Sequence, residues 1–147
     1  MTVERELAGC VALVTGSARN IGRAIALALA DAGAAVMVTG RQALADAETV
    51  AAEIQHGGGR ATAMTADIGD PAAVAALVAA TVERLGRLDV LVNNASVRRE
   101  VAFADLDYAE WRAVLASTLD GAYLCSRAAL PHLIASGRGA IVNIGGL

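Results

Sequence analysis

Short apolar runs alternate with longer segments of helical periodicity along this chain. The runs are rich in β-branched and small apolar residues, which is typical of buried strands. They predict strands at Val11–Val14, Ala35–Thr39, Ala61–Thr65, Val90–Val92 and Ala140–Ile144. Because strands that alternate with helices form parallel sheets covered on both faces, we expect an α/β fold with one doubly wound parallel sheet.

Helix start and stop signals lie between these runs. Asp70 and Pro71 supply an N-cap and a first-turn proline for a helix that runs to about Leu85. Gly33 stands where the first helix should end, and the three glycines at 57–59 should turn the second helix into the third strand.

A long helix is predicted before the last strand. Asp107 and Glu110 have the spacing of a capping box, and Gly137 follows as a stop signal. One stripe at helical spacing lies between them: Trp111, Leu115, Thr118, Ala122, Ser126, Ala129 and Leu133. We therefore expect a helix of about 28 residues, roughly 40 Å long, with this stripe on the sheet.

The composition excludes several classes of protein. The 147 residues are 56% hydrophobic and 18% charged with a net charge of −3, so we expect one domain over residues 1–147 and neither disorder nor a basic nucleic-acid surface. No segment reads as a secretory signal or a membrane helix. Cys10 and Cys125 lack metal-ligand spacing and read as buried apolar residues in a reducing compartment, so a cytoplasmic location is expected, with no metal site.

The segment Thr15–Gly22 joins the first predicted strand to the first helix. A helix N-terminus has unpaired N–H groups and partial positive charge, and glycines allow an anion to approach the backbone. We therefore predict a phosphate-binding turn for a dinucleotide, alternatively a tight turn alone. Its candidate contacts are Gly16, Ser17, Arg19, Asn20, Ile21 and Gly22.

Two arginines favour NADP over NAD as the cofactor. Arg41 follows the second strand, where a carboxylate typically binds the adenosine ribose of NAD, and Arg19 lies inside the glycine turn. Two guanidinium groups at the ribose would favour a 2′-phosphate. Alternatively, each arginine is a solvated surface charge.

The loops after the third and fourth strands supply further candidates. Asp67 and Ile68 suit an adenine amino group beneath an apolar wall, although Asp67 also suits a turn cap. Asn93 and Asn94 suit a brace between neighbouring strands or a turn, and the small Ala95 would let a ribose or nicotinamide pass close by.

In combination these motifs resemble the short-chain dehydrogenase/reductase family, in order and over essentially the whole chain. The matching segments are the glycine turn Thr15–Gly22, Asp67, the segment 93–95 and the strand 139–144. The resemblance implies a Rossmann-type sheet of strand order 3-2-1-4-5. It also implies hydride transfer between a nicotinamide and a small carbonyl or alcohol substrate, with a tyrosine whose pKa a nearby lysine lowers, a serine and an asparagine.

Four positions depart from that family pattern. Asn20 replaces a glycine of the turn, which an amide side chain tolerates in left-handed backbone, and Ser96 replaces a glycine after Ala95. Thr118 stands at the family's helix asparagine, where we expect its hydroxyl to bond the carbonyl four residues earlier. Gly146 stands at the serine.

The tyrosine and lysine of the family reaction have no counterpart. The sequence contains no lysine, so no residue is predicted to be catalytic, and this chain alone should be inactive. We expect a longer parent protein, truncated here after the fifth strand, whose last strand would otherwise be an exposed edge.

Three hypotheses remain. The first is the cofactor-binding portion of an NADP-dependent oxidoreductase, and the second is a catalytically inactive NADP-binding half-domain or scaffold. A flavodoxin-like nucleotide binder is a weaker third. The resemblance also implies a homo-oligomer, a dimer or tetramer paired through the long helix.

Overall fold

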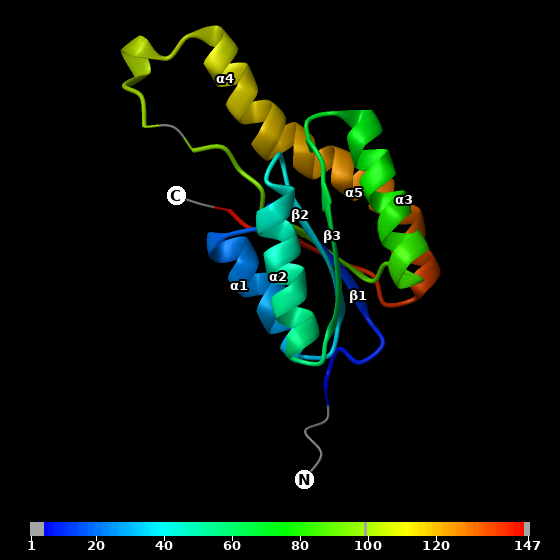
Figure 1. Ribbon diagram of the computed structural model, residues 1–147. Coiled ribbons are helices and arrows are strands. Elements are labelled where there is room, and N and C mark those ends of the chain that lie inside the picture. Colours follow the sequence, from blue (N-terminus) through cyan, green and yellow to red (C-terminus); the bar gives the residue numbers. More distant parts are fainter. Residues whose placement is uncertain (1–4, 99, 146–147) are drawn as a thin grey trace.

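Five parallel strands form the sheet at the centre of the molecule, and the computed structural model describes residues 5–98 and 100–145 (Figure 1). The strands are β1 (Val11–Val14), β2 (Ala35–Gly40), β3 (Arg60–Thr65), β4 (Val90–Asn93) and β5 (Ala140–Asn143). Their order is β3-β2-β1-β4-β5, and every neighbouring pair is parallel. This confirms the expected α/β class and strand order.

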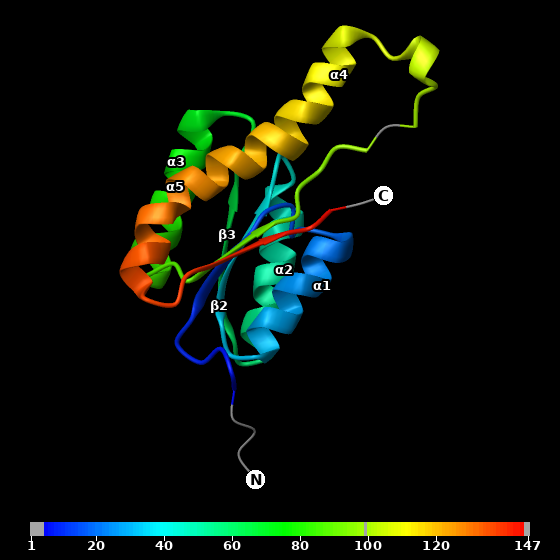
Figure 2. The ribbon, with the colours of Figure 1, turned by 180° about the vertical axis from the view of Figure 1, so that it is seen from behind.

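Helices cover both faces of the sheet. Helices α1 (Asn20–Asp31) and α2 (Leu44–His56) lie on one face, while α3 (Pro71–Leu85) and α5 (Gly121–Ser136) lie on the other (Figures 1 and 2). Along β1 to β4 the side chains alternate between these two layers, as the pleat requires, whereas the positions of β5 are exposed. In β1, for example, Leu13 packs with the α3 and α5 layer and Val14 packs with the α1 and α2 layer.

Two of the predicted helix signals are confirmed, one at the start of α3 and one at the end of α5. The Asp70 carboxylate accepts a hydrogen bond from the Ala72 N–H at 3.0 Å and caps α3. Gly137 ends α5 with a φ of +73°, a left-handed conformation that glycine adopts without strain. Local sequence therefore sets these boundaries.

The long predicted helix forms over its predicted length, but one turn within it is π-helical. Helix α4 (Tyr108–Leu115) passes into a π-helical turn, η2 (Ala116–Asp120), before α5 begins, and a short 3-10 helix, η1 (Phe103–Asp105), precedes α4. The predicted stripe is therefore wrong in its first half. A π-helical turn shifts the register of the face that follows, and α4 extends past the sheet, where little is available for packing (Figure 1). The buried positions of α5 are Gly121, Cys125, Ala129 and Leu133.

Asp89 forms a buried ionic cluster just before β4, at the amino end of the strands. Its carboxylate accepts hydrogen bonds from the Val11 N–H at 2.8 Å, from Arg87 Nη2 at 2.7 Å and from Arg138 Nε at 3.3 Å. Burial alone raises the pKa of this carboxyl, but the bonds from Arg87, Val11 and Arg138 hold the pKa of Asp89 below its ordinary value. Sequence reasoning missed this cluster.

Both cysteines are buried as free thiols, as the sequence analysis predicted. Cys10 lies beside β1, and Cys125 lies on the buried face of α5. Burial raises the pKa of Cys125 to about 11, so its thiol stays protonated near neutral pH.

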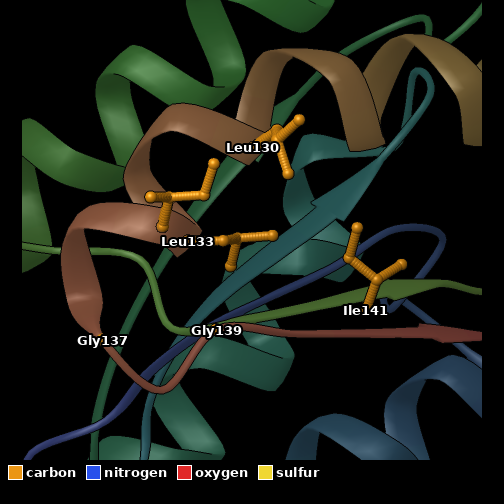
Figure 3. Close-up of a pocket in the computed structure, with 6 residues that line it drawn as sticks. Leu130, Leu133, Gly137, Gly139 and Ile141 are labelled. Carbon is orange, nitrogen blue, oxygen red and sulfur yellow. The ribbon is translucent and has the colours of Figure 1, made fainter.

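An apolar surface lies between α5 and β5, on the outer side of the sheet. A pocket of about 330 Å³ opens there, and Figure 3 shows Leu130 and Leu133 of α5 beside Ile141 of β5. Among the described residues no strand lies beyond β5, which confirms it as an exposed edge in this part of the chain. A search of the same residues found no helix with the length and apolar character needed to cross a membrane.

Candidate dinucleotide-binding site

The carboxyl ends of β1, β2, β3 and β4 bring the predicted site residues to one end of the sheet. The strand order reverses beside β1, between β2 and β4, which is the position where doubly wound sheets bind ligands. The loop after each of these four strands carries at least one candidate. By contrast, the pocket of Figure 3 includes Gly137 and Gly139, which precede β5 at the opposite end.

The glycine turn packs closely against the loop after β4. Gly16 has a φ of +63°, and a Cβ built on it would lie 2.9 Å from the Ala95 Cα. A Cβ built on Gly22 would overlap the Gly16 carbonyl oxygen and lie 2.5 Å from Asn94 Nδ2. Asn20 has a φ of +51°, which confirms that an amide residue takes the left-handed conformation here. The turn therefore requires both glycines for its shape.

Buried hydroxyl groups fix the base of this turn. Ser17 is fully buried, where its Oγ donates to the Val14 carbonyl at 2.7 Å and accepts from the Thr39 N–H at 2.9 Å. Thr15 Oγ1 accepts hydrogen bonds from the N–H groups of Asn94 and Ala95, each at 3.0 Å. The Ser17 hydroxyl thus holds β1 to β2, and the Thr15 hydroxyl holds β1 to the loop after β4.

The first turn of α1 fits a phosphate group. No side chain among the described residues caps this helix, so the N–H groups of Asn20, Ile21 and Gly22 lack intrahelical partners. Ile21 is 60% exposed and Arg19 is also exposed at the same end. The bare amide groups, the helix dipole and the close-packed glycines together make a cradle suited to a diphosphate.

Arg41 and Asp67 meet across the ends of β2 and β3. Arg41 Nη2 lies 2.8 Å from Asp67 Oδ2, while Asp67 Oδ1 accepts a hydrogen bond from the Gly69 N–H at 2.9 Å. The turn-capping alternative for Asp67 is therefore confirmed, and the carboxylate also pairs with Arg41. Ile68 is only 7% exposed and packs against Gly121 of α5, so it presents little surface to a ligand.

The two asparagines brace the strands, as one reading of the sequence predicted. Asn93 Nδ2 donates to Ser126 Oγ at 3.1 Å and to Asn143 Oδ1 at 2.9 Å, which links β4 to α5 and β5. Asn94 Nδ2 donates to the carbonyl oxygens of Thr15 and Gly16 at 3.0 and 3.2 Å. Sequence reasoning missed Ser126 and Asn143 as partners because both lie far along the chain.

Among the described residues, the positions that depart from the family pattern and the two tyrosines do not form a catalytic set. Thr118 lies exposed in the turn η2, and the expected bond from its hydroxyl to a helix carbonyl is not found among the described residues. The two tyrosines, Tyr108 and Tyr123, are both exposed, and the Tyr123 hydroxyl accepts a hydrogen bond from Arg127. Gly146 lies outside the described residues. No metal-ligand cluster occurs in residues 5–98 and 100–145.

Comparison with known proteins places this architecture in a family. The short chain dehydrogenase family model matches residues 10–147. The chain is 40% identical over 134 residues to a 3-oxoacyl-(acyl-carrier-protein) reductase of Synechocystis sp., covering 91% of this chain and 54% of that protein. It is 41% identical over 137 residues to a (2S)-[(R)-hydroxy(phenyl)methyl]succinyl-CoA dehydrogenase subunit of Thauera aromatica, again covering 91% and 54%. The chain thus spans about half the length of these relatives.

Solved structures agree with the sequence comparisons. A dehydrogenase/reductase from Sinorhizobium meliloti superposes with a TM-score of 0.91 at 38% identity, covering 97% of this chain and 56% of that one. A short chain dehydrogenase from Burkholderia cenocepacia in complex with NADP superposes with a TM-score of 0.89 at 40% identity, covering 96% and 57%. The chain therefore belongs to the short-chain dehydrogenase/reductase family.

Proposed function

We propose that residues 1–147 form the cofactor-binding domain of an NADP(H)-dependent oxidoreductase whose substrate is a small carbonyl compound or alcohol. The observation that carries the proposal is the start of α1, which no side chain caps and which lies beside Gly16 and Gly22. Two arginines, Arg19 and Arg41, lie at the same end of the sheet. The cofactor would supply a nicotinamide that accepts or donates hydride. The relative from Burkholderia cenocepacia, which was solved with NADP, supports the choice of cofactor.

Different residues of this chain would bind different parts of the cofactor. The N–H groups of the turn 16–22 would bind the diphosphate, with Ser17 keeping the turn in shape. Arg19 and Arg41 would meet the adenosine 2′-phosphate, and the loop 93–95 would lie beside the nicotinamide ribose. Asp67 and Ile68 would lie at the adenine, with Ile68 acting mainly by packing beneath the loop.

A second candidate is a binding protein without catalytic activity. The sequence contains no lysine, so no lysine of this chain lowers the pKa of a tyrosine hydroxyl, and both tyrosines are exposed outside the candidate site. Under either candidate we expect the 147-residue chain to bind the cofactor without turnover. Extension of the chain with a tyrosine and lysine from its gene would restore carbonyl reduction only under the first.

The cofactor preference is testable on the chain itself. We expect NADPH to bind about 10- to 100-fold more tightly than NADH, because a charge-assisted contact with one phosphate contributes about 1.5–3 kcal/mol. Titration with each reduced cofactor, followed by nicotinamide fluorescence, measures both dissociation constants. Equal affinity for the two would contradict the preference for NADP, and tighter binding of FMN than of either would favour a flavodoxin-like binder.

We also propose that the chain assembles as a dimer or tetramer through the outer face of η2 and α5. Four large apolar side chains are exposed on this face: Leu119, Tyr123, Leu130 and Ile134. These side chains follow helical spacing on one face, interrupted by Arg127, which bonds the Tyr123 hydroxyl. An exposed apolar face of this kind is typical of an interface. The aromatic ring of Tyr123 and the aliphatic neighbours would pack against the same face of a second copy.

A charge placed on that stripe should separate the subunits. We expect Ile134→Glu to convert the assembly to monomers in multi-angle light scattering, since burying one carboxylate opposes association by several kcal/mol. The control is Ala45→Glu, which adds the same charge to the exposed surface of α2. A monomeric unsubstituted chain, or an Ile134→Glu variant that still assembles, would exclude this interface.

A further inference from the structure

An ion pair spans the adenosine end of the proposed cofactor site. Arg41 follows β2 and Asp67 follows β3, and both Nε and Nη2 of Arg41 contact the same carboxylate oxygen, at 3.1 and 2.8 Å. The second oxygen of Asp67 accepts the Gly69 N–H at 2.9 Å. The carboxylate is thus anchored to its own loop and pairs with the guanidinium through its other oxygen.

This pair changes what Arg41 offers to an anion. The side chains of Arg41 and Asp67 are 63% and 46% exposed, so the pair is open to solvent and exchangeable. A phosphate that approaches Arg41 meets a cation whose charge a carboxylate already partly neutralises. Arg19, by contrast, has no ion-pair partner among the described residues.

We propose that Asp67 sets the cofactor preference of this chain by competing with the 2′-phosphate of NADP for Arg41. The inference rests on the proposed function. Binding of NADP requires the phosphate to displace or share the carboxylate, whereas NAD leaves the pair intact. Asp67 therefore lowers the preference for NADP below the value that Arg41 and Arg19 alone would produce.

The ratio of two affinities isolates this effect from any contact with adenine. NAD and NADP carry the same adenine, so a contact between Asp67 and that ring cancels in the ratio of their dissociation constants. The competition for Arg41 does not cancel, because only NADP carries the 2′-phosphate. The ratio Kd(NAD)/Kd(NADP) is therefore the proper measurement, and it needs no catalytic activity.

The test uses Asp67→Asn in the 147-residue chain, with isothermal titration of NAD and NADP. Asparagine keeps the Oδ1 acceptor for the Gly69 N–H and removes only the charge. We expect the ratio to rise about three- to fivefold, the effect of an exposed ion pair. In an Arg41→Met background the same substitution should change the ratio by less than about twofold.

Asp70→Asn is the matched control. Asp70 lies three residues further along the same loop and caps α3, but it makes no ion pair with Arg41. Asparagine retains the cap, so the ratio should stay unchanged. Titration with 2′,5′-ADP and 5′-AMP repeats the comparison on the adenosine half alone, and circular dichroism verifies that each variant is folded.

The outcomes separate the inference from the proposed function. An unchanged or lower ratio in Asp67→Asn, or an equal rise in the Arg41→Met background, overturns the competition. A ratio near one in the unsubstituted chain contradicts the proposed preference for NADP, yet a rise in Asp67→Asn would still support the competition. Failure of every variant to bind any of the four nucleotides overturns both.

Discussion

Replacement of Asp89 by alanine is expected to lower the free energy of unfolding by about 2–4 kcal/mol. The change leaves the Val11 N–H, a buried donor, without its acceptor, and it removes the common partner of Arg87 and Arg138. The two arginine side chains are 42% and 46% exposed and can turn toward water, so the loss stays below that of a fully buried charge cluster. Urea unfolding followed by circular dichroism measures the difference.

The control for Asp89 is Asp31→Asn, an exposed acid at the end of α1. Its free energy of unfolding should stay within about 0.5 kcal/mol of the unsubstituted chain. A loss of less than about 1 kcal/mol in Asp89→Ala would show that the cluster does not stabilise the amino end of the sheet.

The depressed pKa of Asp89 also predicts the direction of a pH effect. Because the folded protein holds the pKa below its unfolded value of about 3.9, the unfolded state binds the proton more readily. The stabilisation is fully present above that unfolded pKa and is lost as the pH falls through the folded pKa. Unfolding measured between pH 6 and pH 3 should show a steeper loss below about pH 4 in the unsubstituted chain than in Asp89→Asn.

The strands and the glycine turn could be predicted because their signals are local. Each predicted strand matches an observed one to within one residue at either end. The left-handed conformation of Asn20 also follows from the residue type and its position in the turn. The hydrophobic periodicity, the turn residues and the helix caps each specify structure within a few residues of themselves. The fold class could therefore be predicted from the sequence.

The long-range polar contacts could not be predicted. Arg138 reaches Asp89 across 49 residues, and Ser17 bonds the N–H of Thr39 across 22. Sequence alone gives no distance between such residues until the strand order is known. The ion pair of Arg41 with Asp67 is of the same kind, because each residue was a plausible cofactor contact without any sign that they meet.

The long helix forms as predicted, from Tyr108 to Ser136, but the first half of its predicted buried stripe is wrong, for a different reason. An apolar stripe predicts a buried face only where another element covers it. Helix α4 extends beyond the sheet (Figure 2), and Trp111 is 46% exposed. After the π-helical turn, Ala129 and Leu133 of the predicted stripe are buried, together with Gly121 and Cys125, which the stripe did not include. Such a turn depends on tertiary packing, for which the sequence carries no simple signal.

Gly22→Ala should produce the largest loss of cofactor affinity among single methyl additions to the glycine turn. The new Cβ would overlap the Gly16 carbonyl oxygen and lie 2.5 Å from Asn94 Nδ2. The backbone carbonyl of Gly16 and the Asn94 amide, which makes two hydrogen bonds, cannot move aside without a large cost in free energy. The turn must therefore separate from α1. We expect the dissociation constant of NADPH to rise at least about tenfold, since the phosphate-binding N–H groups would no longer converge.

Two opposing effects decide the stability of the same variant. Alanine is favoured over glycine within a helix by about 1 kcal/mol, whereas forcing an added methyl into a packed site costs about 1–3 kcal/mol. Steric overlap should win here, because the displaced Gly16 carbonyl and Asn94 amide also lose their hydrogen bond of 3.2 Å. We therefore expect a net loss of about 1–2 kcal/mol in urea unfolding.

Gly57→Ala separates the steric effect from the general effect of adding a methyl group. Gly57 ends α2 with a φ of −75°, and its added Cβ would meet the Ile54 carbonyl oxygen at an ordinary 3.5 Å. This variant should bind NADPH as the unsubstituted chain does. If Gly22→Ala also binds NADPH normally while remaining folded, the close contact of α1 with the glycine turn is not what shapes the phosphate cradle, and binding must depend on the cations at Arg19 and Arg41 alone.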